Sequence, residues 1–177
     1  MIKSNYFILT GAMGGGKSTI LAKLAEAGVY CVPEPARALL AEQRMSEAAG
    51  VPEQQAEPFP MRMLGRAIHN YQEKQPLAHS IIFDRAIPDM IAYANLSQLD
   101  ATAYVNASQE FRYNPTVFYF GAWQAIYAND EDRKIGFEGA QKFGIDVKAI
   151  YESLGYRMLD VPRLSIEERA KFILARI

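Results

Sequence analysis

A glycine-rich segment near the start of the chain limits most strongly what the chain can fold into. Residues 11–18 read GAMGGGKS, which fits the pattern G-x-x-x-x-G-K-[ST] without a gap. An apolar run, Tyr6–Leu9, precedes the segment, and a helical pattern begins at Lys17. A glycine-rich motif of this kind between a strand and a helix is typical of a phosphate-binding loop. The backbone amides and the helix N-terminus of such a loop hold phosphate oxygens. The segment therefore predicts a nucleotide site.

The residues of this loop have separate expected roles. Lys17 is expected to reach the β- and γ-phosphates, and Ser18 to place its hydroxyl on Mg²⁺. Glycines allow positive φ and let the amides approach the phosphates. A glycine-rich turn without a ligand is the alternative, and the agreement of motif and context argues against it. We expect the loop to bind ATP through Gly11, Ala12, Met13, Gly14, Gly15, Gly16, Lys17, Ser18 and Thr19.

Strand and helix patterns alternate along the rest of the chain. Short apolar runs bounded by glycine or turn residues indicate buried strands, and apolar residues three or four positions apart indicate helices. Five buried strands separated by helices predict a mostly parallel sheet covered on both faces, which is a three-layer α/β fold. The expected strands are 6–9, 29–32, 80–84, 116–120 and 156–161, and the expected helices are 17–27, 35–48, 61–75, 88–96, 101–108, 137–154 and one opening at the capping box 165–168.

Composition excludes several classes of protein. The 177 residues suit one domain, expected over 1–177. A net charge of −1 supplies no positive field for nucleic acid, although a local groove stays open. One cysteine rules out an intrachain disulfide and a cysteine-based zinc site. No apolar run is long enough for a membrane span, and no leader pattern is seen, so we expect a cytoplasmic protein.

Two acidic residues follow expected strands at the edge where such sheets bind ligands. Asp84 is predicted to hold Mg²⁺, and Glu34 to accept a proton from an attacking hydroxyl or to position that hydroxyl. Arg85 and Arg37 are predicted to bind phosphate through their planar guanidinium groups. The alternatives are a structural ion pair between Asp84 and Arg85, and a Glu34 that only favours a helix N-terminus.

The segment after the fourth strand begins with apolar residues and ends with charged ones. We interpret residues 121–136 as a lid that closes on the phosphates, in which Arg133 would stabilise charge on the transferring group. A solvated charged turn is the alternative interpretation. Residues 162–164 either line an adenine pocket or form a turn before the last helix, and the sequence does not separate these alternatives.

The chain resembles the AAA_28-type P-loop family, which is similar to nucleoside and nucleotide kinases and to the ribosylnicotinamide kinase domain. The resemblance implies the strand order 2-3-1-4-5 and a lid around Arg133. It also implies that Glu34, in the pair Glu34-Pro35, serves as the base for a 5′-hydroxyl. The lid departs from several such kinases, which carry more than one arginine there. The residues that carry the resemblance are 11–19, 34–37, 84–85, Asp89, Tyr93, Tyr127, Asp130, Arg133, 154–156, 161–162 and 168–169.

These observations predict a P-loop kinase that transfers the γ-phosphate of Mg·ATP to a small hydroxyl-bearing, nucleoside-like acceptor. The acceptor is expected between Glu34, Arg37, Asp84, Arg85 and the 45–75 region, whose role the sequence does not define. A regulatory nucleotide switch with slow hydrolysis and a protein partner is the alternative. An oligomeric motor ATPase is disfavoured because the chain leaves no room for an added helical domain. A homodimer, and the choice between ATP and GTP, are left open.

Overall fold

The computed structural model describes residues 2–48, 58–74, 77–127 and 135–177, with side chains 46–48 left aside. Its centre is a five-stranded sheet in the order β2-β3-β1-β4-β5, in which every neighbouring pair is parallel. This confirms the fold class and the strand order expected from the resemblance. The strands are β1 (Tyr6–Gly11), β2 (Tyr30–Val32), β3 (Ile81–Asp84), β4 (Thr116–Phe120) and β5 (Arg157–Asp160).

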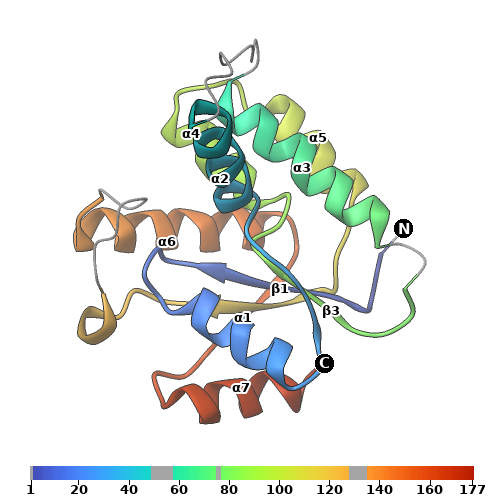
Figure 1. The fold of residues 1–177 in the computed structure, drawn as a ribbon, viewed down its shortest axis with the longest axis vertical. Helices are drawn as coiled ribbons and strands as arrows, with labels where there is room; N and C mark the ends of the chain where they lie inside the picture. The colour runs from blue at the N-terminus through green and yellow to red at the C-terminus, as the bar shows by residue number, and fades with distance from the viewer. Residues whose placement is uncertain (1, 49–57, 75–76, 128–134) are drawn as a thin grey trace.

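Helices cover both faces of this sheet (Figure 1). The helices α1 and α7 lie on one face, and α2, α3, α4, α5 and α6 lie on the other side, where α3, α4 and α6 share the larger core cluster with the sheet. Among the described residues, no helix is both long and apolar enough to cross a membrane. The helices are α1 (Lys17–Glu26), α2 (Pro35–Ala48), α3 (Phe59–Glu73), α4 (Asp89–Leu96), α5 (Thr102–Glu110), α6 (Phe137–Ser153) and α7 (Ile166–Leu174), with a 3₁₀ turn at Gln124–Ile126.

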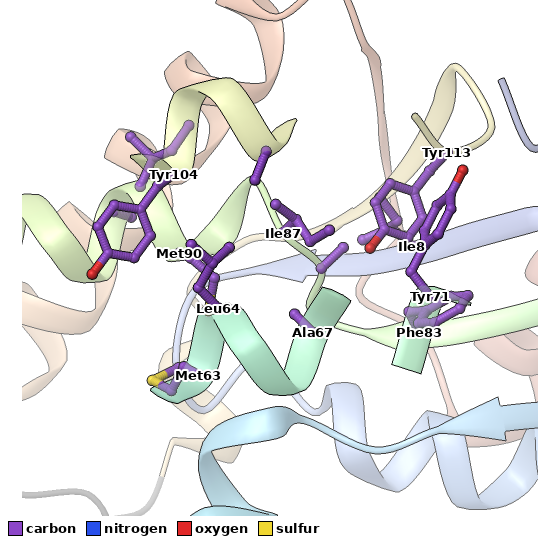
Figure 2. Close-up of a cluster of buried hydrophobic side chains, with 14 of the residues drawn as sticks. Ile8, Met63, Leu64, Ala67, Tyr71, Phe83, Ile87, Met90, Tyr104 and Tyr113 are labelled. Atoms are coloured by element: carbon purple, nitrogen blue, oxygen red, sulfur yellow. The ribbon is translucent and has the colours of Figure 1, made fainter. Parts of the chain in front are cut away.

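Alternation along β1 divides the core into two clusters. Tyr6 and Ile8 point to the α6 side, whereas Phe7 and Leu9 point to the α1 and α7 side, because successive side chains of a strand face opposite ways. All four are buried. The larger cluster joins the sheet to α3, α4 and α6, and Figure 2 shows part of it around Met63, Leu64, Ala67, Tyr71, Phe83, Ile87, Met90, Tyr104 and Tyr113.

Several local predictions are confirmed at the helix ends. Pro35 begins α2, and Gly28 follows α1 with φ of +85°, as a helix C-terminus favours. Ser165 and Glu168 form the predicted capping box of α7. Most other boundaries differ from the predicted ones by one or two residues. For example, α3 begins at Phe59, two residues before the predicted start, because Pro60 is well tolerated in a first turn.

Candidate active site

The phosphate loop joins β1 to α1 and uses glycine where other residues would not fit. Gly11 has φ of +122°, and a Cβ there would overlap the backbone oxygen of Phe120 in β4. Gly14 and Gly16 also have positive φ, at +75° and +84°. These conformations are strained for L side chains, which explains the glycines in physical terms. The loop therefore leaves β1 against β4, where the Ala12 amide donates to the Phe120 carbonyl at 2.8 Å, and then enters α1.

Lys17 is buried at the first turn of α1. Its Nζ donates to the carbonyl oxygen of Ala12 at 2.7 Å, so the side chain lies back over its own loop. Burial, reinforced by the nearby Arg85, lowers the pKa of Lys17 to about 8, against the attraction of Asp84 and Glu34. A bound anion would raise that pKa again, because an opposite charge favours the ammonium form.

Ser18 and Asp84 form a pair suited to a hard cation. The Ser18 hydroxyl donates to Asp84 Oδ2 at 3.2 Å. Asp84 Oδ1 is buried, and the described residues give it no hydrogen-bond partner. Burial raises the pKa of Asp84 to about 6, and Lys17 partly offsets it. A buried carboxylate oxygen without a partner beside a hydroxyl is the oxygen donor set that Mg²⁺ prefers, so these residues fit the ion.

Glu34 lies beyond β2 and binds Arg85 and Tyr93. Its Oε1 accepts from Arg85 Nε at 2.8 Å and from the Tyr93 hydroxyl at 3.0 Å. Its Oε2 has a looser contact, 3.7 Å from Arg37 Nε. Burial alone would raise the pKa of Glu34, but Arg85 and Lys17 outweigh burial, so the pKa is lowered. Glu34 is therefore ionised at neutral pH. Its Oε1 accepts two hydrogen bonds, whereas its Oε2 has the longer contact with Arg37.

Asp89, at the start of α4, holds Arg85 from the other side. Asp89 Oδ1 accepts from Arg85 Nη1 at 2.9 Å and from the Thr10 hydroxyl at 2.5 Å. Asp89 Oδ2 accepts from the Tyr151 hydroxyl at 2.6 Å and from the Ala86 amide at 2.9 Å. Arg85 itself has φ of +62°, an uncommon conformation for a side chain of this size. Such backbone strain persists where surrounding contacts hold it, as they do here.

These groups meet at a cavity of about 470 Å³ between the phosphate loop, α2 and α3. Its walls combine loop residues, charged groups and an apolar surface. Phe59 and Leu40 supply part of that apolar surface, opposite the loop. The lining residues are Met13, Gly14, Gly16, Lys17, Ser18, Thr19, Glu34, Ala36, Arg37, Leu40, Phe59, Arg85, Tyr93 and Ile126.

Several of the predicted site residues are brought together around one cavity. Lys17, Ser18, Glu34, Arg37 and Arg85 line one cavity. The alternative of an Asp84–Arg85 ion pair does not hold, because Arg85 pairs instead with Glu34 and Asp89.

As in the expected strand order, β2 lies beyond β3, and Glu34 after β2 reaches the cavity.

Three expectations concern residues at the edges of the site. Arg133 lies outside the described residues, as does part of the proposed lid over residues 121–136, namely 128–134, so both stay predictions. Residues 162–164 are not among those that line the cavity; Arg163 donates to the carbonyl oxygen of Ala122 at 2.7 Å.

Sequence reasoning assigned no role to several residues that complete the site. Asp89 and Tyr93 were part of the resemblance, and their spacing of four and eight residues after Arg85 places them on the face of α4 toward it. Thr10 and Tyr151 lie far from Asp89 in the sequence, and no local pattern identifies them. Phe59 and Leu40 read as ordinary apolar positions of two helices.

Comparisons with known structures agree on the fold. Deoxyadenosine kinase from M. mycoides with bound dATP aligns with a TM-score of 0.62 at 17% identity, over 97% of this chain and 98% of that chain. Thymidylate kinase from Ehrlichia chaffeensis aligns with a TM-score of 0.61 at 17% identity, over 97% of both chains. At such low identity the likeness establishes a common P-loop kinase fold. No curated protein sequence matches.

The family model extends this likeness to the sequence. The model of the AAA_28 family, described as an AAA domain, matches residues 6–169. That range includes the phosphate loop, Glu34, the adjacent residues Asp84 and Arg85, and Arg169. The match confirms the resemblance read from the sequence. The chain therefore belongs to the AAA_28 family of AAA domains.

Proposed function

We propose that this protein is a kinase that transfers the γ-phosphate of Mg·ATP to a small hydroxyl-bearing acceptor of the nucleoside class. One observation carries the proposal: the phosphate loop and the ionised Glu34 line the same cavity. A nucleotide switch would need only the loop, whereas this cavity continues past the loop to Arg37, Leu40 and Phe59. Room for a second ligand beside the phosphates favours transfer to an acceptor over slow hydrolysis.

The residues on the nucleotide side would bind and neutralise the phosphates. Lys17 would leave the Ala12 carbonyl and bind the β- and γ-phosphates, and the loop amides would bind the remaining oxygens. Mg²⁺, when held by Ser18 and Asp84, would supply charge neutralisation. Phosphoryl transfer asks little covalent chemistry of the protein, so positioning and charge stabilisation supply most of the catalysis.

The residues on the acceptor side would orient a hydroxyl. Glu34 Oε1 is occupied by Arg85 and Tyr93, so Oε2 is the oxygen free to accept a hydrogen bond from the acceptor. Its lowered pKa makes Glu34 a weak base before transfer, and we expect it to orient the hydroxyl first and take the proton late. Phe59 would face a flat apolar group such as a base, in accord with a nucleoside-like acceptor.

Steady-state ADP release from Mg·ATP tests the proposal, alone and with a panel of nucleosides, ribosides and nucleoside monophosphates. We expect one class of acceptor to raise the release above background and to gain one phosphate by mass spectrometry. The Lys17→Ala variant is expected to lose turnover and to bind nucleotide weakly. If no acceptor changes the rate of ADP release, the result would contradict the kinase and favour the nucleotide switch. The switch would then be tested by searching for a protein partner that distinguishes the ATP-bound and ADP-bound states.

A further inference from the structure

Arg169 is a buried arginine of α7 that lies behind the phosphate loop. It is 5% exposed, and its Nη2 donates to the carbonyl oxygen of Gly15 at 2.8 Å. The guanidinium lies over two rings, with its Cζ 4.9 Å from the centroid of Phe120 and 5.4 Å from that of Trp123. A helix near the end of the chain therefore contacts the loop near its start.

Within the part of the chain that the structure describes, Arg169 pairs with no carboxylate. Lys17, Arg85 and Arg169 are the buried basic side chains of the described residues. Lys17 has Asp84 and Glu34 nearby, and Arg85 pairs with Glu34 and Asp89. For Arg169, the described residues supply no ion pair, its Nε is buried without a partner, and burial lowers its pKa. An uncompensated buried charge is costly, so its presence beside a phosphate loop points to an anion that completes it.

The contact with Gly15 also sets the direction of a loop amide. In a trans peptide the C=O and the following N–H point in opposite directions. When the Gly15 carbonyl is held on Arg169, the N–H of Gly16 faces the opposite side. Gly14 and Gly16 both line the cavity, so this amide lies at its wall. A Cβ on Gly16 would lie 2.9 Å from Arg169 Nη1, and its φ of +84° disfavours other residues as well.

We propose that Arg169 is a positioning residue of the nucleotide site, which holds the phosphate loop through the Gly15 carbonyl and supplies a positive charge that a polyphosphate neutralises. This inference rests on the nucleotide binding of the proposed function and on no property of the acceptor. It places the C-terminal helix α7 in the nucleotide site, although α7 contributes no residue to the wall of the cavity.

Two substitutions separate charge from packing. Arg169→Met keeps a long side chain between the rings and removes the charge, and Arg169→Lys restores the charge. Arg176→Met is the matched control, because Arg176 also donates to a carbonyl, that of Phe172 at 2.7 Å, and lies over a phenylalanine ring, but at an exposed position away from the loop. Binding of Mg·ADP and of magnesium pyrophosphate is measured by calorimetry, and the melting temperature without ligand is measured beside it.

We expect Arg169→Met to weaken both ligands by about tenfold or more, as loss of a charge-assisted contact does, while its melting temperature stays equal or rises. Arg169→Lys is expected to recover most of the binding, and Arg176→Met to bind as the parent protein does. Binding by Arg169→Met within twofold of the parent protein would overturn the inference. A lowered melting temperature with a binding loss that lysine does not restore would also overturn it, since that result marks a structural role.

The outcomes also separate this inference from the proposed function. If the parent protein binds neither Mg·ADP nor magnesium pyrophosphate, the proposed nucleotide site itself fails, and the inference fails with it. If the parent and Arg169→Met bind alike, only the inference fails. Should Arg169→Met not fold, Arg169→Lys decides: binding close to that of the parent protein supports the role of charge, and a tenfold loss at an unchanged melting temperature overturns it.

Discussion

Gly144 of α6 lies directly against the start of the phosphate loop. A Cβ at this position would lie 2.9 Å from the Cβ of Ala12 and 3.0 Å from its Cα and N. Ordinary contacts between such atoms are about 3.5–4.0 Å, so the helix or the loop would have to move. Because Ala12 supplies the carbonyl that accepts from Lys17, we expect Gly144→Ala to disturb both stability and the loop.

The magnitude follows from two opposing effects. Alanine in a helix interior is favoured over glycine by about 0.8–1 kcal/mol, and overpacking costs about 1–3 kcal/mol. Gly65 of α3 supplies the control, because it is exposed and a Cβ there would meet nothing within 4 Å. Gly65→Ala carries the propensity gain alone, so the difference in unfolding free energy between the two variants isolates the packing cost at about 1–3 kcal/mol.

Urea unfolding of the parent and the two variants measures these free energies. We expect Gly65→Ala to be more stable than the parent protein, with a melting temperature raised by about 2–4 °C, and Gly144→Ala to fall below Gly65→Ala by the packing cost. Gly144→Ala is also expected to bind Mg·ADP more weakly. Equal stabilisation by both substitutions would refute the close approach of α6 to the loop.

Three further predictions concern single side chains. Glu34→Gln should leave the affinity for Mg·ATP nearly intact and slow transfer by about 100-fold or more, measured by single-turnover kinetics; an unchanged rate would make Glu34 structural. Asp89→Ala should lower the unfolding free energy by about 3–5 kcal/mol, because it leaves buried Arg85 short of one partner; a loss below about 1 kcal/mol in urea unfolding would contradict this. Burial raises the pKa of the only cysteine, Cys31, to about 11. At pH 8, iodoacetamide should therefore label Cys31 about 20-fold more slowly than a model thiol. This figure allows for the stronger nucleophilicity of a more basic thiolate. That rate should rise about tenfold per pH unit up to pH 10, and mass spectrometry that finds labelling at the model rate would refute the burial of this thiol.

The fold followed from the sequence because its signals are local and agree with one another. The glycine-rich loop, the short apolar runs and the helix ends at Pro35 and Ser165 each reflect a nearby physical constraint. The strand order needed the resemblance, because no local pattern states which strands are neighbours. The site was predictable where residues follow strand ends, as Glu34 and Asp84 do.

The rest of the site depends on contacts between distant residues. The bonds of Asp89 to Thr10 and Tyr151 span 79 and 62 residues, and the bond of Arg169 to Gly15 spans 154. Periodicity assigned Tyr151 to a helix but did not identify its partner. The pairing of Arg85 with Glu34 and Asp89, rather than with Asp84, and the positive φ of Arg85 likewise follow from no local sequence pattern.

The fate of the γ-phosphate tests the central claim most directly. The protein is incubated with ATP labelled in the γ-phosphate, Mg²⁺ and the nucleoside panel, and the label is divided between the organic product and inorganic phosphate. We predict that the label passes mainly to a hydroxyl of one acceptor class, and that both products disappear in Lys17→Ala. Label found only in inorganic phosphate, whatever acceptor is present, would contradict a kinase.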